Sequence, residues 1–397
     1  MRNKIQELAR TLHEKTVVNR RHLHAHPELS FEEKETSAFV AKKLGEMGIP
    51  FEPMAGYGLV AKITGEKSSD AVVALRADMD ALPITEANEV PYKSTNPGVM
   101  HACGHDVHTS SLLGAAEILN QLKAEFGGTI KLIFQPAEEK LPGGASLMIK
   151  EGVLENPKPQ AVIGQHVMPL IEAGKVGFRS GKYMASTDEI YVTVKGKGGH
   201  GAQPQQNVDP VIITAHMLTA LQQIVSRHAD PKLPSVLSFG KVIANGATNV
   251  IPNEVYLEGT FRTLDENWRE EAHQRILKMA KGVVEGMGGT VDFEIRKGYP
   301  FLINEEKLTA RTRAYAEDYL GRENVLDLDI WMAAEDFAYY SQVADACFYR
   351  LGTGNAAKGI TSSVHTPTFD VDESSLEVGP GLMAYIAIKQ LEHESNG

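Results

Sequence analysis

The hydrophobic periodicity of this chain changes twice, near residues 184 and 298, and this feature constrains the fold more than any other. Before the first change, short apolar runs typical of buried strands, such as 161–164, alternate with helical patterns. Beyond it, every second residue is apolar, which is the period of a strand with one solvent-exposed face, as in Ile190, Val192 and Val194. After Gly298 the first pattern returns. The sequence therefore predicts an α/β unit that is interrupted by a separate α+β unit.

The chain length agrees with this division. A single hydrophobic core stops growing at roughly 250 to 300 residues, and this chain has 397. We expect a larger domain, built from 1–183 and 298–397, with a central sheet flanked by helices. A smaller domain over 184–297 should carry two helices, near 210–227 and 266–287, on an antiparallel sheet.

The N-terminal region contains a predicted helix start. Ser30 and Glu33 stand three residues apart, which is the spacing of a capping box. Apolar residues then recur at helical spacing until Gly48, which predicts a helix between these points.

Composition and charge exclude several classes of protein. The formal net charge of -11 repels phosphate backbones and anionic membrane surfaces, so we expect neither nucleic acid nor membrane as a partner. Only Cys103 and Cys347 occur, which excludes a disulfide framework and fits a reducing compartment. The N-terminus lacks the pattern of a signal peptide, and no apolar run approaches the roughly 18 residues of a membrane span. The expectation is a cytoplasmic protein.

The segment His101–His108 concentrates three imidazoles and the thiol of Cys103 in one short stretch. Thiolate and imidazole both bind zinc-like ions, and a neighbouring carboxylate such as Asp106 can orient an imidazole. The pattern indicates metal ligands, among them Cys103 and His105. The alternative is the N-terminus of a helix with solvated histidines.

Two adjacent carboxylates, Glu138 and Glu139, follow the predicted strand 130–134. Neighbouring side chains point in different directions, so one can bind a metal while the other faces the substrate and moves a proton. Open α/β sheets place ligands at the carboxyl ends of their strands, which favours this function over a pair of glutamates on an exposed turn.

Two further histidines complete a candidate ligand set. His166 follows the predicted strand 161–164, and His365 lies in a predicted loop. Each alone is as compatible with a structural role. Together the candidates match the number of protein donors that two metals need: Cys103, His105, Glu139, His166 and His365.

The order of motifs along nearly the whole chain resembles one group of dinuclear metallopeptidases, which includes aminoacylase, hippurate hydrolase and auxin-conjugate hydrolase. The motifs that carry this resemblance are Arg21–Glu28, Leu75–Pro83, His101–His105, Glu138–Glu139, Gly198–Ala202, Asn249–Asn253, Ala334–Phe337 and His365–Pro367. Several ordered motifs at compatible spacing are more specific than any one of them.

The resemblance implies a metal-binding catalytic domain, interrupted by a lid that mediates formation of a homodimer or a higher homo-oligomer. It implies two divalent metal ions per subunit, which can be zinc, manganese, cobalt or nickel. The five candidates above are its metal ligands. Glu138 matches the general base, Asp80 a carboxylate that supports the metals, and His200 a histidine that stabilises the oxyanion in a neighbouring subunit. Asn249 and Arg262 match lid positions that hold a substrate carboxylate.

The expected function is hydrolysis of the amide bond of N-acyl amino acids or similar small conjugates by a metal-activated water. The nearest alternative is a dipeptidase or aminopeptidase on the same scaffold. An enzyme with Cys103 as its nucleophile and a binding protein with a structural metal are the remaining candidates. Lys140–Pro142 and Val107 depart from the pattern of the group beside the expected site, which leaves substrate preference open.

Overall fold

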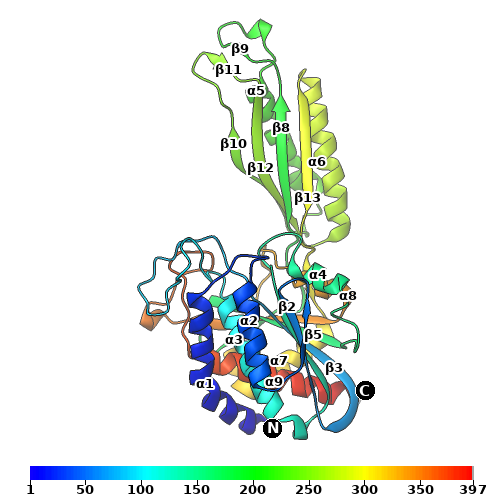
Figure 1. Ribbon diagram of the computed structural model, residues 1–397. Coiled ribbons are helices and arrows are strands. Elements are labelled where there is room, and N and C mark those ends of the chain that lie inside the picture. The colour runs from blue at the N-terminus through cyan, green and yellow to red at the C-terminus, as the bar shows by residue number, and fades with distance from the viewer. Residues whose placement is uncertain (396–397) are drawn as a thin grey trace. The chain divides into compact units, whose positions relative to one another are not determined.

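Two units make up the computed structural model, which describes residues 1–395 (Figure 1). The first unit contains Met1–Lys182, Ile303–Ile330 and the chain from Asp336 onward. The second unit contains Tyr183–Leu302 and Trp331–Glu335. The predicted fold class, a central sheet flanked by helices with a smaller α+β insertion, is confirmed.

An eight-stranded sheet forms the centre of the first unit. The core strands β4, β3, β5 and β16 run parallel to one another. Residues 71–78 of β3 are all buried, which explains the continuous apolar run over 71–75. The strand order is β1 (Phe51–Met54), β2 (Gly58–Thr64), β4 (Gly127–Gln135), β3 (Lys67–Asp78), β5 (Ala161–Glu172), β16 (Ala346–Gly354), β6 (Val176–Phe178) and β15 (Val325–Asp327).

Helices pack on this sheet and on one another. In Figure 1, α1 and α2 lie beside α3. Both α3 and α9 pack directly on strands, and α1 packs on both of these helices. The helices of the unit are α1 (Arg2–Ala25), α2 (Lys34–Glu46), α3 (His105–Gln121), α4 (Gly144–Lys150), α7 (Glu306–Leu320), α8 (Ala338–Val343) and α9 (Ser375–Glu394), with short turns η1 (Lys123–Glu125), η4 (Arg322–Asn324) and η5 (Ala356–Lys358).

The predicted capping box is wrong. Helix α2 is present, but it begins at Lys34, and within the described residues Glu33 makes no side-chain cap. The carboxylate of Glu28 instead accepts the backbone N–H groups of Glu35 (3.1 Å) and Thr36 (2.8 Å). The side chains of Ser30 and Glu33 are instead engaged by residues far along the chain, the carboxylate of Asp80 and the backbone N–H of Ala137.

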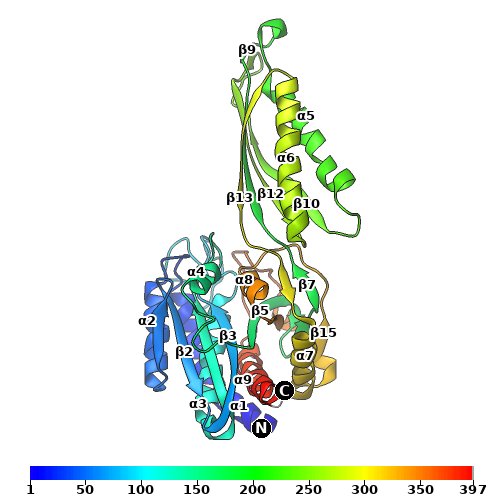
Figure 2. The same ribbon diagram turned by 90° about the vertical axis from the view of Figure 1, so that its right-hand side faces the viewer.

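An antiparallel sheet and two helices form the second unit. Figure 2 shows α5 and α6 side by side on one face of the sheet. Ile190, Val192 and Val194 of β8 are buried against these helices, as their alternation predicts. The sheet order is β10 (Ser235–Ile243), β12 (Glu254–Thr263), β8 (Asp188–Lys195) and β13 (Thr290–Lys297). The helices are α5 (Pro210–Leu221) and α6 (Glu266–Gly286), with short turns η2 (Pro204–Gln206) and η3 (Ile224–His228).

Two small ribbons complete the fold. One pairs β11 (Val250–Ile251) with β9 (Gly199–His200), and the other pairs β14 (Leu302–Asn304) with β7 (Gly181–Met184). Among residues 1–395, none of the helices combines the length and the apolar character that crossing a membrane requires.

Candidate metal centre

The register of the parallel strands brings the sequence motifs to one edge of the sheet. Asp78 at the end of β3 lies opposite Gln135 at the end of β4, and Arg76 lies opposite Gly164 of β5. The segments that follow these positions therefore meet at the carboxyl ends of the strands, where α/β sheets bind their ligands.

The structure brings all five predicted ligands together. Cys103, His105 and His166 form one group of donor atoms, and Cys103, Glu139 and His365 form another, each with its donors within 4.8 Å of one another. Cys103 Sγ lies 3.4 Å from His166 Nε2 and 3.3 Å from His365 Nε2. His365 Nε2 lies 3.2 Å from Glu139 Oε1. The described residues therefore include groups that can hold two metal ions.

Orientation of the imidazoles fits metal binding. His166 donates its Nδ1 proton to the carbonyl oxygen of Val167 at 2.7 Å, which turns Nε2 toward Cys103. His105 Nδ1 faces Asp80 Oδ1 at 3.2 Å, and its buried Nε2 has no hydrogen-bond partner among the described residues. Metal-binding histidines have this arrangement, because a hydrogen bond at one nitrogen leaves the other free for the metal.

Negative charge at the site favours a cation. Burial disfavours a charged imidazole at His105, yet Asp78 and Asp80 raise its pKa to about 10. Burial and the carboxylates of Glu139 and Glu138 raise the pKa of the Cys103 thiol well above its ordinary range. A nucleophilic cysteine needs a lowered pKa, so the surroundings of Cys103 suit a metal ligand better than a nucleophile. The donor set of thiolate, imidazole and carboxylate fits zinc-like ions.

Asp80 lies at the centre of the hydrogen bonds around the site. Its carboxylate accepts the hydroxyl proton of Ser30 at 2.6 Å and the backbone N–H groups of Glu138 (3.0 Å) and Glu139 (2.9 Å). It also contacts His105. Asp80 therefore orients one predicted ligand and the backbone of both glutamates, which is a larger role than the cap at the end of a strand.

Glu138 is buried beside the ligands. Its Oε1 accepts the backbone N–H of Asp336 at 3.2 Å, and its Oε2 lies 4.0 Å from His105 Nε2. Glu138, Glu139 and His105 also form a group with donor atoms within 4.8 Å. A carboxylate in this position can exchange a proton with a molecule held beside the ligands.

A supporting network, which was not predicted from the sequence, lies behind the ligands. His108 Nδ1 donates to Asp78 at 2.5 Å, and His108 Nε2 accepts the backbone N–H of Val167 at 2.8 Å. Arg76 donates to the other oxygen of Asp78 at 2.6 Å. These atoms are engaged with one another, so the network positions the ligands. The signal that could have revealed it is the spacing of Asp78 and Asp80 at the end of one strand.

Ser30 and Glu33 belong to the same surroundings. Ser30 binds Asp80, and the buried carboxylate of Glu33 accepts the backbone N–H of Ala137 at 2.7 Å. Burial, together with the charge of Asp80, raises the pKa of Glu33 to about 7. Glu33 thus holds the residue that precedes Glu138.

The second unit carries the other predicted site residues. His200, on β9, is exposed and accepts the backbone N–H of Ala202 at 3.0 Å. Asn249 directly precedes β11, the partner of β9, and its backbone carbonyl oxygen accepts a hydrogen bond from the backbone N–H of Gly201 at 2.8 Å. Arg262 lies on β12, half-buried, and donates to Thr260 at 3.3 Å. His200 and Asn249 are thus on one ribbon, whereas Arg262 is on the main sheet.

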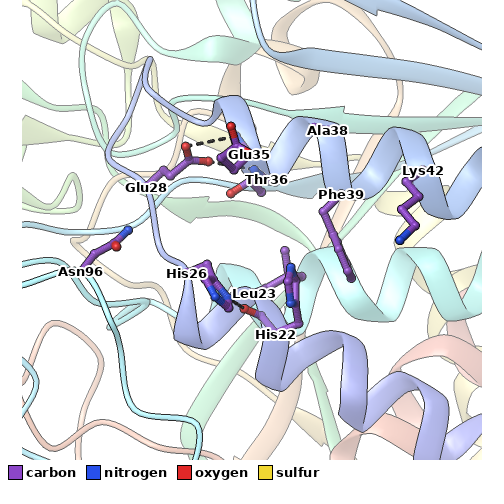
Figure 3. Close-up of a pocket in the computed structure, with 10 residues that line it drawn as sticks. All are labelled: His22, Leu23, His26, Glu28, Glu35, Thr36, Ala38, Phe39, Lys42 and Asn96. Atoms are coloured by element: carbon purple, nitrogen blue, oxygen red, sulfur yellow. Dashed lines mark hydrogen bonds between the residues drawn. The ribbon is translucent and has the colours of Figure 1, made fainter.

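A pocket of about 450 Å³ lies between α1 and α2 (Figure 3). The ring of His22 stacks on Phe39 there, with ring centroids 4.3 Å apart. None of the lining residues belongs to the groups that could hold a metal.

Comparison with known proteins gives one family. The model of the peptidase family M20/M25/M40 matches residues 74–389. An N-acyl-L-amino acid amidohydrolase of Geobacillus stearothermophilus is 45% identical over 289 residues, which cover 72% of this chain and 77% of the relative. The IAA-amino acid hydrolase ILR1-like 4 of Arabidopsis thaliana is 39% identical over 378 residues, which cover 94% of this chain and 84% of the relative.

The fold of a solved structure matches as well. A Bacillus subtilis protein described as a dinuclear metal-binding peptidase of the M20 family superposes with a TM-score of 0.82 at 33% identity. The match covers 96% of this chain and 99% of that protein.

Proposed function

Because this chain belongs to the peptidase family M20/M25/M40, we propose that it hydrolyses the amide bond of N-acyl amino acids or similar small conjugates, with Glu138 as the general base. It is a metal-dependent amidohydrolase. The observation that carries the assignment of residues is the convergence of two donor groups on Cys103, with the carboxylate of Glu138 beside them.

The ligands that we propose for two metal ions are Cys103, His105, Glu139, His166 and His365. Bound there, the ions supply Lewis acidity, which makes a water molecule more acidic and polarises the carbonyl group of the substrate. The soft thiolate of Cys103 suits zinc, and the carboxylate and imidazoles also accept manganese, cobalt or nickel.

Glu138 performs the proton transfers in this proposal. Its carboxylate takes a proton from the attacking water and later delivers it to the nitrogen of the leaving amine. The carboxylate of Asp80 binds the backbone N–H groups of Glu138 and Glu139 and so holds this backbone in place. One side chain can then bind metal while the other moves a proton. Burial of Glu138 keeps bulk water from competing for the proton.

We propose that 184–297 acts as a lid and dimerisation domain between the catalytic segments 1–183 and 298–397. His200 would stabilise the oxyanion in a neighbouring subunit, a contribution of roughly 3 kcal/mol for a well-placed donor. Arg262 forms no ion pair among the described residues, so its planar guanidinium can bind a substrate carboxylate, with Asn249 as a second donor. Exposed apolar residues support self-association through this unit: Val211, Ile212, Val242, Ile243 and Val250.

A cytoplasmic location is part of the proposal. Cys103 and Cys347 are both free and buried, which suits a reducing compartment.

A hydrolysis panel tests the function. Chelator-stripped protein is supplied separately with zinc, manganese, cobalt or nickel and is assayed on N-acetyl amino acids, N-benzoyl amino acids and free dipeptides. We expect no turnover without metal and turnover of the N-acyl amino acids with at least one metal. Preference for free dipeptides would instead support a dipeptidase, and full activity in the stripped protein would contradict the proposal.

A further inference from the structure

Asp336 lies where three segments of the first unit meet. Its carboxylate accepts hydrogen bonds from Arg76 of β3 at 2.7 Å, from the side-chain amide of Gln135 at the end of β4 at 2.8 Å, and from the backbone N–H of Ala145 in α4 at 2.9 Å. The side chains of Asp336 and Arg76 are both fully buried. Both carboxylate oxygens thus accept hydrogen bonds, and the group holds protein segments in place.

These partners lie at the two ends of one loop. Gln135 is the last residue of β4, and Ala145 is the second residue of α4. The intervening residues include Glu138 and Glu139, the predicted base and a predicted ligand. Since Asp336 binds both ends, its carboxylate determines how far apart they are and how the loop is oriented.

The backbone of Asp336 contacts the proposed base directly. Its N–H donates to Glu138 Oε1 at 3.2 Å. Because the side chain of Asp336 is bound to Arg76 and Gln135, it also determines the position of the N–H group that donates to Glu138. Displacement of Asp336 would move this donor and the loop together.

We infer that Asp336 is a positioning residue for the hydrolysis. Its side chain holds the loop that contains Glu138, and its backbone N–H binds the carboxylate of Glu138, so both contacts keep this carboxylate in its working orientation. The inference rests on the proposed function of Glu138. Arg76 extends the same network to Asp78, which it binds at 2.6 Å, so one buried cation connects the loop of the base with the network behind the ligands.

The variant Asp336→Asn tests this role. The new amide has one acceptor oxygen in place of two, and its NH2 group faces either Arg76 or the backbone N–H of Ala145, which are donors themselves, so the loop is held less firmly. A displacement of about 1 Å in a catalytic group lowers turnover about 100-fold. We expect kcat to fall about 100-fold with KM changed less than about threefold, because the contact acts on the chemical step. Elemental analysis should still find the metal content of the wild type.

A compensating variant separates positioning from general destabilisation. Gln135 Oε1 already accepts a hydrogen bond from Arg76 at 2.9 Å. The double variant Asp336→Asn with Gln135→Glu exchanges carboxylate and amide, which keeps one negative charge beside Arg76 and reverses the donor and acceptor. We expect it to recover at least about tenfold of the lost kcat. If Asp336→Asn does not fold, Gln135→Leu removes only the amide contacts and should lower kcat roughly tenfold.

Asp372→Asn is the matched control. Asp372 is also a buried aspartate of the first unit, and it accepts hydrogen bonds from Lys358 and from the backbone N–H of Ser374, outside the site. All variants are assayed on the N-acyl amino acid that the wild type hydrolyses best. The control should retain kcat within about threefold of the wild type.

Three results would overturn the inference but not the proposed function. They are a kcat of Asp336→Asn equal to that of the control, a loss of kcat that follows loss of metal, and a double variant without recovery. A wild type that hydrolyses no substrate of the panel would overturn the proposed function, and the inference with it.

Discussion

At the scale of single residues, the site depends on carboxylates with different tasks. Asp80 accepts backbone N–H groups, Glu139 faces His365, and Glu138 faces His105 and the N–H of Asp336. The surroundings of each carboxylate, and not its chemical type, decide what it does.

Glu138→Gln is the most direct test at this scale. The amide keeps the size of the side chain but cannot take a proton, so we expect kcat to fall by about 100- to 10,000-fold. The metal content should stay that of the wild type, because the five proposed ligands are intact. Steady-state kinetics and elemental analysis on the same preparation check both expectations. Loss of metal would make Glu138 a ligand instead.

At the scale of elements, buried ion pairs connect helices to strands. In the second unit, Asp188 of β8 binds Arg269 at 2.5 Å and His273 at 2.6 Å, both on α6. Burial opposes the charge of Asp188, but the hydrogen bonds from His273 and Arg269 lower its pKa. These contacts connect the main helix of the unit to its sheet.

The stabilisation from Asp188 should depend on pH. Because the folded state lowers its pKa, the stabilisation is present above the ordinary aspartate pKa, near 4, and is lost as the pH falls below that value. Asp188→Asn removes the buried negative charge beside Arg269, which keeps its ion pair with Glu266 at 3.0 Å, so we expect a loss of about 2 kcal/mol of unfolding free energy at pH 7. Urea unfolding at pH 7, 5 and 3 should show the difference from the wild type shrinking toward pH 3. A difference that is independent of pH would contradict this account.

At the scale of the whole molecule, our proposal assigns residues of two subunits to each active site. His200 and Asn249 lie on an exposed ribbon of the second unit, whereas the five proposed metal ligands and Glu138 lie in the first. If His200 acts in a neighbouring subunit, each active site takes residues from two chains.

Subunit mixing tests this arrangement. His200→Ala and Glu138→Gln homo-oligomers should each be nearly inactive. In a mixed dimer, one site keeps both Glu138 and a partner's His200, so mixing equal amounts should restore about a quarter of wild-type activity, since half of the dimers are mixed and each has one intact site. Size-exclusion chromatography checks that subunits exchange. Absence of recovery after exchange would exclude a shared site.

Local sequence patterns predicted some features of the fold and the site, but not those that depend on tertiary contacts. Periodicity predicted the insertion and the helix α6, which spans Glu266–Gly286, because each depends on which face of an element is buried. The capping-box spacing failed at Ser30 and Glu33, which bind Asp80 and Ala137. A three-residue spacing contains no information about partners tens of residues away.

The sequence by itself determined the fold class and the residue types that could carry metal chemistry, because hydrophobic period and ligand chemistry are properties of neighbouring residues. The tertiary structure alone decided that Asp78 and His108 support the ligands and that Asp336 spans the loop of Glu138. Such roles depend on contacts between β3, α3 and the residues before α8, which are far apart in the chain. Only folding brings their side chains within hydrogen-bonding distance.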